Sequence, residues 1–264
     1  MRRPAVWVVL AALLSTVGCA RPKIDWAAIL HARGDAYLDQ HHSEVVHLNS
    51  GCSGTLITPR IVLTAAHCVV QSSDFPTVDI NSRDGEEVTF PVTQCFVHPL
   101  AYSPAVACGT EPQGNINRAH DLALLVLEDP VPPELAIARP ALIEGSLEDE
   151  AWASRPVRLV GWHRRPQRFG SLRRYSGLHF VEEFRRGAIV SVPPDTHRGF
   201  ASVRGNSGGP ALMRYDGEEV VVGVLSGGAG LGSLSRRYSL STPTFSGVNG
   251  RWVLRHIERV ERGQ

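Results

Sequence analysis

The sequence predicts an all-β protein that ends in one helix. Short runs rich in valine, isoleucine and leucine recur from Glu44 onward, and glycine, proline, asparagine and aspartate separate them. Short strands spaced in this way are typical of β-sandwiches and β-barrels. Only the last segment, "NGRWVLRHIERVERG", places Trp252, Val253 and Ile257 at helical spacing, which predicts a helix over about 250–262.

The expected strands can be followed in chain order. They are EVVHL (44–48), GTLI (54–57), IVLTAA (61–66), VTFPV (88–92), LALLVL (122–127), VRLVGW (157–162), GAIVSV (187–192) and VVVGVLS (220–226). A proline-rich stretch at 128–146 divides the chain and predicts a crossing between two halves. Nine arginines lie between Arg155 and Arg186, interrupted by Glu182 and Glu183. We expect a solvated loop there rather than a site for a polyanion.

Composition supports a globular protein with a sizeable core. Of the 264 residues, 43% are hydrophobic and 20% are charged, which argues against extensive disorder. The formal net charge is only +1. We therefore expect no nucleic-acid partner.

The N-terminus has the anatomy of an export signal. "MRRPAVWVVLAALLSTVGCA" combines two arginines, an apolar run and then small residues, and this run is short for a transmembrane helix. "STVGC" resembles a bacterial lipobox, although Thr16 stands where leucine is usual. We expect a lipoprotein-type signal peptide at 1–19 with Cys19 lipidated, attaching the protein to a membrane of the bacterial cell envelope. Cleavage after Ala20 and free secretion is the alternative. Residues 20–43 are expected to form a tether.

Four cysteines remain after export, which in an oxidising compartment predicts two disulfides. Three pairings are possible. Adjacency in sequence favours Cys52 with Cys68 and Cys95 with Cys108.

A serine flanked by glycines marks one candidate for catalysis. In "RGNSGGPAL" (204–212), Ser207 stands in a glycine-rich segment of a kind that forms tight turns with converging N–H groups. With Ser207 as the nucleophile, the N–H groups of Gly205 and Ser207 would form an oxyanion hole. A plain glycine turn is the alternative.

A serine nucleophile needs a base, and the base needs an acceptor that orients it. "AAHC" offers His67 as the base, and "HDLALLVL" offers Asp121 at the start of an apolar, partly buried strand. A metal site would need three or four ligands at workable spacing, which His41, His42 and His120 do not provide. We expect neither a metal ion nor a cofactor.

Four motifs in this order resemble the chymotrypsin/trypsin-like serine peptidase family. They are "GCSGTLI…IVLTAAHC", "DLALLVL", "VGWHRR" and "GNSGGP…VVGVLSGG". The resemblance implies a peptidase domain over 44–264, made of two six-stranded antiparallel barrels at about 44–135 and 150–250. It places the active site in the cleft between them.

The resemblance also assigns roles to individual residues. It implies a triad of His67, Asp121 and Ser207 that hydrolyses polypeptides through an acyl-enzyme, and a Cys52–Cys68 disulfide that holds the histidine loop. Ser226 would line the substrate-binding strand and is a candidate hydrogen-bond donor to Asp121.

Departures from the family pattern concern activation and specificity. Asn206 stands where the animal digestive enzymes have an aspartate that pairs with a new N-terminus, so we expect activity without activation cleavage. The floor of the specificity pocket falls on Ala201, which offers no charge for a basic side chain. Gly227 and Gly228 would leave the pocket entrance open. We expect a small or medium apolar residue before the scissile bond.

Two other functions are alternatives to an active peptidase. A catalytically silent binding module could use the same scaffold, but the triad and its glycines are complete here. An esterase of the α/β-hydrolase type would require the order serine, acid, histidine and a Gly-x-Ser-x-Gly elbow, and the sequence has neither.

Overall fold

The computed structural model describes residues 37–70, 76–81, 87–144, 152, 154–164, 172–194, 205–215, 217–229 and 238–263. All of them belong to one compact unit, residues 32–264. The expected signal peptide with Cys19, most of the expected tether and the pocket residue Ala201 lie outside the described residues.

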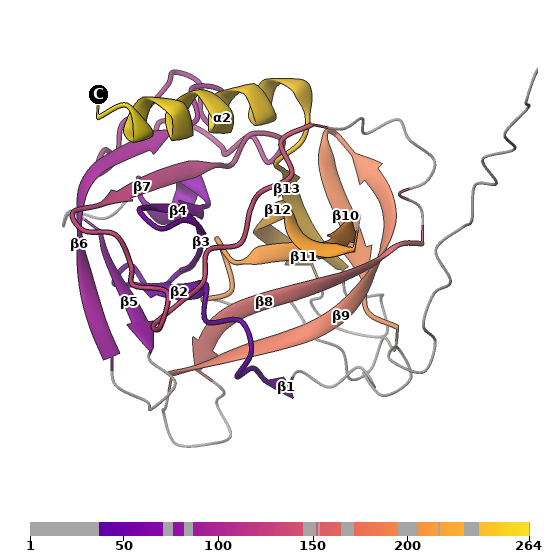
Figure 1. Ribbon diagram of the computed structural model, residues 1–264. Coiled ribbons are helices and arrows are strands. Elements are labelled where there is room, and N and C mark those ends of the chain that lie inside the picture. Colours follow the sequence, from indigo (N-terminus) through magenta and orange to yellow (C-terminus); the bar gives the residue numbers. More distant parts are fainter. Residues whose placement is uncertain are drawn as a thin grey trace, which may run out of the picture. The chain divides into compact units, whose positions relative to one another are not determined.

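Six strands from the first half of the chain close into an antiparallel barrel (Figure 1). Around the barrel they are β2 (Val45–Leu48), β3 (Ser53–Thr58), β4 (Ile61–Thr64), β7 (Ala123–Leu127), β6 (Glu87–Val97) and β5 (Thr77–Asn81). Every residue of β4 and β7 is buried, which explains why these strands are apolar throughout. By contrast, exposure alternates along β6 from Glu87 to Val92, because one of its faces meets water.

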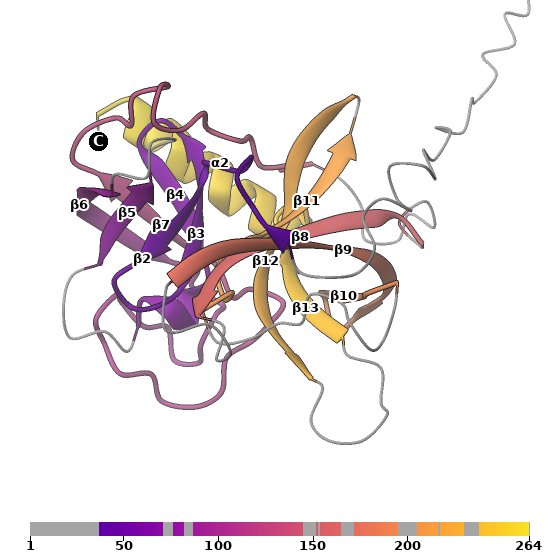
Figure 2. The same ribbon diagram turned by 90° about the horizontal axis from the view of Figure 1, so that it is seen from below.

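A second barrel follows, and Figure 2 shows it beside the first. Its strands are β8 (Pro156–Arg164), β9 (Leu172–Arg185), β10 (Ala188–Val192), β13 (Tyr238–Pro243), β12 (Glu218–Ala229) and β11 (Pro210–Tyr215). Pairing of β8 with both β9 and β11 closes the ring, and β1 (Tyr37–Leu38) adds to β9. The predicted fold class, two six-stranded antiparallel barrels with a C-terminal helix, is confirmed.

Two segments tie the barrels together. The proline-rich stretch runs from β7 to β8, and in it Arg139 N donates to Leu56 of barrel one while Leu142 N donates to Val221 of barrel two. Helix α2 (Gly247–Glu261) follows barrel two but packs on barrel one. Trp252 is buried in that contact, with its ring centroid 5.0 Å from that of His98. No helix in the described ranges has the length and apolarity needed to cross a membrane.

The arginine-rich region is the main difference between expectation and structure. Where a solvated loop was expected, residues 172–185 form β9, a long strand that pairs with β8, β10 and β1. Arg174 is only 8% exposed, and its guanidinium lies over the ring of Trp162 and donates to Val45 O. The loop expectation was wrong because the arginine stem packs on an aromatic ring while its charge finds buried acceptors.

An ionic cluster is buried beside β2. His42 Nδ1 lies 2.6 Å from Asp39 Oδ2, and His42 Nε2 lies 3.3 Å from Glu219 Oε2. Burial alone would lower the pKa of His42, but hydrogen bonds to these two carboxylates and the charges of Asp39 and Glu44 raise it to about 9. The hydrogen bond from His42 in turn holds the pKa of Glu219 below its ordinary value. The cluster therefore favours a protonated His42 in the folded state.

This cluster predicts a loss of stability at alkaline pH. Between pH 6.5 and about 9 the folded chain keeps a proton on His42 that the unfolded chain has released. The contribution of His42 to the free energy of unfolding should thus be complete below pH 6.5 and should fall by roughly 3 kcal/mol as the pH rises through this window. Urea denaturation at several pH values measures the slope. His42→Gln should flatten it, whereas His41→Gln, at the exposed neighbouring histidine, should keep it. Equal slopes in all three proteins would contradict the assignment.

Candidate active site

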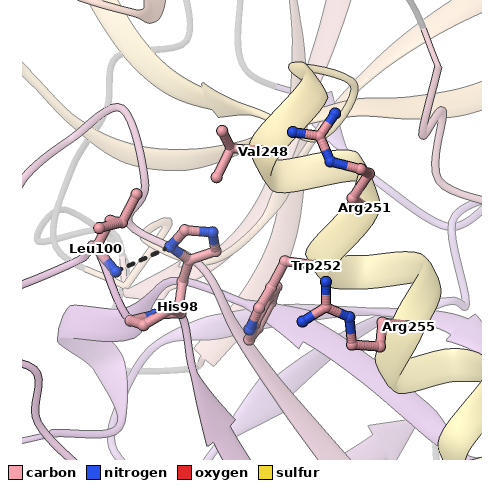
Figure 3. Close-up of a pocket in the computed structure, with 7 residues that line it drawn as sticks. His98, Leu100, Val248, Arg251, Trp252 and Arg255 are labelled. Carbon is pink, nitrogen blue, oxygen red and sulfur yellow. Dashed lines mark hydrogen bonds between the residues drawn. The ribbon is translucent and has the colours of Figure 1, made fainter.

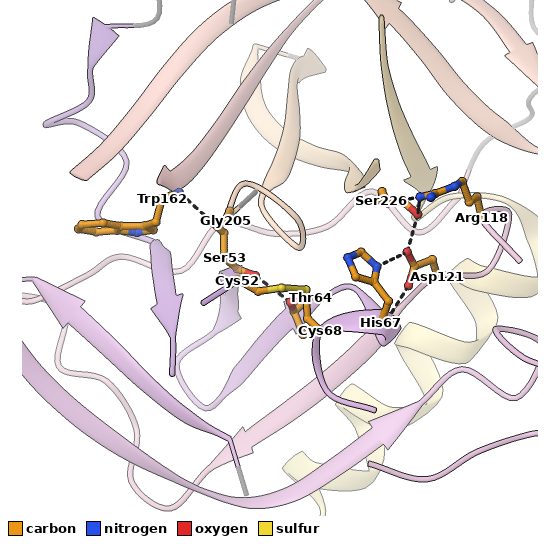
Figure 4. The surroundings of a disulfide bond; sticks show 10 residues. All are labelled: Cys52, Ser53, Thr64, His67, Cys68, Arg118, Asp121, Trp162, Gly205 and Ser226. Atoms are coloured by element: carbon orange, nitrogen blue, oxygen red, sulfur yellow. Dashed lines mark hydrogen bonds and ion pairs between the residues drawn. A yellow bond between two sulfur atoms is a disulfide. The ribbon is translucent and has the colours of Figure 1, made fainter. Parts of the chain in front are cut away.

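The histidine loop begins where β4 ends. The chain turns into a short 3-10 helix, Ala66–Cys68, which carries His67, and Cys68 is bonded to Cys52 immediately before β3. The second disulfide joins Cys95 to Cys108. These are the two pairs that adjacency in sequence favours. The first disulfide fixes the position of His67 relative to β3 (Figure 4).

His67 and Asp121 are joined by two hydrogen bonds. His67 Nδ1 lies 2.7 Å from Asp121 Oδ2, and the backbone N–H of His67 donates to Asp121 Oδ1 at 3.0 Å. Asp121 is fully buried, whereas the side chain of His67 is 28% exposed. Because the carboxylate accepts a hydrogen bond from Nδ1–H, Nε2 is left with a lone pair.

Asp121 has a third donor from the other barrel. Ser226 Oγ of β12 donates to Asp121 Oδ2. A buried carboxylate is costly unless its oxygens accept hydrogen bonds, and here all three donors reach it from the histidine loop and from β12. The carboxylate therefore links the two barrels at the candidate site.

The neighbourhood of His67 also resembles a metal site. Ligand atoms of Cys52, His67 and Cys68 lie within 4.8 Å of one another. However, both sulfur atoms are consumed by the Cys52–Cys68 disulfide, so neither offers a thiolate. The cluster is therefore a histidine beside a structural disulfide.

The turn that carries Ser207 is held against barrel one by Ser53 of β3. Ser53 N donates to Ser207 O at 2.7 Å, and Ser53 Oγ donates to Gly205 O at 2.7 Å. Thr64 Oγ1 in turn donates to Ser53 O. Because Ser53 directly follows Cys52, the backbone of Ser207 is tied to the strand whose disulfide holds the histidine loop. Ser207 itself is half-buried.

Asn206, beside the candidate nucleophile, is fully buried. Its Oδ1 lies 2.8 Å from His163 Nδ1 of β8. A Cβ on Gly161 would lie 2.9 Å from Asn206 Cα and 2.9 Å from Asn206 Oδ1, so the asparagine also sits tightly against β8. This turn is thus bound on both sides, by Ser53 and by His163.

The region of the expected substrate-binding strand differs from the sequence expectation in one respect. Gly227 and Gly228 were expected to leave the entrance open, but the guanidinium of Arg118 lies beside Gly227. Arg118 Nη1 donates to Ser226 O and, at 3.0 Å, to Ser226 Oγ. A glycine at 227 makes room for this side chain, because a Cβ there would lie 2.4 Å from Nη1.

A separate cavity lies between residues 98–100 and helix α2 (Figure 3). Leu100 N donates to His98 Nδ1 at 3.2 Å, and Arg251 and Arg255 line the opposite side. Burial, together with electrostatic repulsion between a protonated His98 and the neighbouring histidines His120 and His256, lowers the pKa of His98 to about 4, so this ring is neutral near pH 7. None of the candidate catalytic residues lines this cavity.

Comparison with known proteins agrees with the fold. The family model described as Trypsin matches residues 33–248. Vitamin K-dependent protein C of Rattus norvegicus is 28% identical over 232 residues, 78% of this chain and 46% of that protein. Serine protease 7 of Drosophila melanogaster is 33% identical over 118 residues, 41% of this chain and 28% of that protein. Proproteinase E of Bos taurus is 39% identical over 66 residues, 23% of this chain and 26% of that protein.

This chain thus spans between 26% and 46% of the length of these relatives. The family match itself covers most of the chain and includes both barrels. The chain belongs to the trypsin family.

Proposed function

We propose that the protein is an exported serine endopeptidase in which Ser207 is the nucleophile, His67 the general base and Asp121 the residue that orients it. The observation that carries the proposal is the hydrogen bond between His67 Nδ1 and the buried Asp121, because it leaves Nε2 as the nitrogen that can accept a proton. Membership of the trypsin family supports a peptidase role with polypeptide substrates.

In the proposed reaction, Ser207 Oγ attacks the carbonyl carbon of the scissile peptide bond while its proton passes to His67 Nε2. The N–H groups of Gly205 and Ser207 stabilise the negative charge on the carbonyl oxygen. His67 then gives the proton to the leaving amine, the C–N bond breaks, and an ester remains on Ser207. Water, deprotonated by His67, hydrolyses that ester and restores the free hydroxyl.

The surroundings of Asn206 support activity without activation cleavage. Asn206 carries no charge that would need a new N-terminus, and its side-chain oxygen already has His163 as a partner. Ala201 remains the proposed floor of the specificity pocket, with a small or medium apolar residue preferred before the scissile bond.

Export is part of the proposal as well. Two disulfides fit a protein that matures in an oxidising compartment. Mass spectrometry of the mature N-terminus distinguishes the two forms of export. A lipidated Cys19 would indicate a lipoprotein of the cell envelope, and an N-terminus at Arg21 would indicate free secretion.

A fluorophosphonate probe tests the proposed catalysis. We expect the unprocessed mature chain to become labelled, because the probe requires only an activated serine and an oxyanion hole. Ser207→Ala should abolish labelling, and Ser50→Ala, at an exposed serine in a turn, should not. Pretreatment with a processing protease should change the labelling rate little. No labelling before or after pretreatment would favour a silent binding module, and labelling only afterwards would overturn the inference from Asn206.

A further inference from the structure

Strand β12 has an edge beside the candidate triad that no described strand pairs with. Leu225 is held by the serine turn, since it donates to Gly209 O and accepts from Gly208 N. Ser226 has no partner in the β12–β13 register, which shifts between Leu225 and Gly227. From Ser226 onward, β12 pairs only with β13 among the described strands. An extended peptide can add to such an edge through the backbone groups that it leaves free.

Arg118 covers the start of this edge. Its guanidinium donates to the Ser226 carbonyl and hydroxyl (Figure 4). It also lies beside Gly227. A peptide that is to hydrogen-bond with the Ser226 carbonyl must therefore move the guanidinium aside or share the acceptor with it.

The backbone around Arg118 is anchored on both sides. Thr242 Oγ1 of β13 donates to Arg118 O at 2.7 Å, and Asn249 Nδ2 of α2 donates to Ala119 O at 2.9 Å. Asn117 N donates to Ala101 O at 2.8 Å. Arg118 is exposed, and its long side chain is held through hydrogen bonds to Ser226 alone among the described residues, so it is the part of this segment that can change position.

The charge of Arg118 has no counter-ion among the described residues. No carboxylate oxygen in that part of the chain lies within the 4.0 Å of an ion pair with its guanidinium. The nearby carboxylate, Asp121, already accepts from His67 and Ser226. The guanidinium of this exposed arginine stands on a fixed backbone beside a strand edge that no described strand pairs with, and it is suited to bind a carboxylate in a bidentate manner.

We infer that Arg118 is a specificity-determining residue that selects peptides with an aspartate or glutamate in the segment lying along Ser226–Gly228. The substrate carboxylate pairs with the guanidinium and draws it off the Ser226 carbonyl, which then accepts a backbone N–H of the peptide. A neutral peptide must displace the same hydrogen bonds without this compensation. The inference rests on the proposed peptidase function.

Matched pairs of peptide substrates test this role of Arg118 in the full chain. Quenched fluorescent peptides that differ only by glutamate or glutamine are compared at successive positions on either side of the scissile bond. At one or more positions we expect kcat/KM to be at least about fivefold higher with glutamate at low ionic strength, and this ratio to fall as salt is added. Arg118→Ala should bring the ratio close to one. Arg118→Glu should reverse it and favour lysine at the same position.

Arg214→Ala serves as the matched control, because Arg214 is an exposed arginine of the β11–β12 hairpin. This variant should keep the glutamate preference of the parent. A ratio near one at every position in the parent, or the same ratio in Arg118→Ala, would overturn the inference. Labelling with the fluorophosphonate probe separates the two levels. Labelling and cleavage without an acidic preference reject the role of Arg118 alone, whereas absence of both rejects the peptidase function as well.

Discussion

Replacing Asp121 by asparagine is expected to lower kcat by about 10⁴-fold, the loss typical of triads in serine peptidases of this family. If the asparagine keeps its oxygen toward the backbone N–H of His67, its NH2 group faces His67 Nδ1. The ring must then carry its proton on Nε2, the atom that should accept the proton of Ser207. The base is thereby lost although the ring stays in place.

Steady-state cleavage of a good peptide substrate measures this loss, and the rate of fluorophosphonate labelling should fall in parallel. Asp129→Asn, at an exposed aspartate just after β7, is the matched control and should retain parent activity. Thermal unfolding of Asp121→Asn shows whether the fold persists. A folded variant that retains more than about a tenth of the parent kcat would reject Asp121 as the orienting residue.

Strands whose burial is uniform are the ones that the sequence reveals most directly. Runs such as IVLT and ALLVL are apolar throughout because β4 and β7 are buried along their whole length. Strand β13 is not predicted, since its fully buried positions are not apolar and include Ser239, Ser241 and Thr242. Strand β9 is also not predicted, because an arginine in the sequence indicates a solvated residue. Arg174 is buried only because Trp162 and Val45 lie beside it in the fold. Tertiary partners, rather than local propensity, decide these strands.

In the candidate site, too, some residues can be predicted from the sequence and others cannot. His67 and Asp121 can be proposed from short motifs, because His67 follows one apolar run and Asp121 precedes another, and each has a chemical role to fill there. Ser53 and Arg118 give no such signal. Ser53 bonds to Gly205 over 152 positions of sequence, and Arg118 bonds to Ser226 over 108. Such contacts depend on how the two barrels meet, and a single sequence does not encode that in any local pattern.

Ser53 is also the reason why a methyl group at position 208 should be damaging. Gly208 has a φ of +83°, and a Cβ there would lie 2.1 Å from Ser53 O and 2.2 Å from Thr64 Oγ1. The backbone oxygen of Ser53 is fixed by its hydrogen bond from Thr64 Oγ1, so the clash can be relieved only if the serine turn moves away from β3. We expect Gly208→Ala to lower the free energy of unfolding by about 3–4 kcal/mol through strain and overpacking. Any folded enzyme should lose roughly 10²-fold in kcat/KM because Ser207 is displaced.

Gly217→Ala separates the clash from the backbone strain. Gly217 has nearly the same φ, +85°, in the β11–β12 hairpin, but a Cβ there would meet nothing within 4 Å. This variant should lose only about 1–2 kcal/mol and should retain parent activity. Urea denaturation and peptide cleavage of the two variants measure the difference. If both variants lost stability equally and both stayed active, the serine turn would not depend on its close approach to Ser53. Unequal losses would show that the glycine beside the nucleophile is required by contact between the barrels, and not only by its own φ angle.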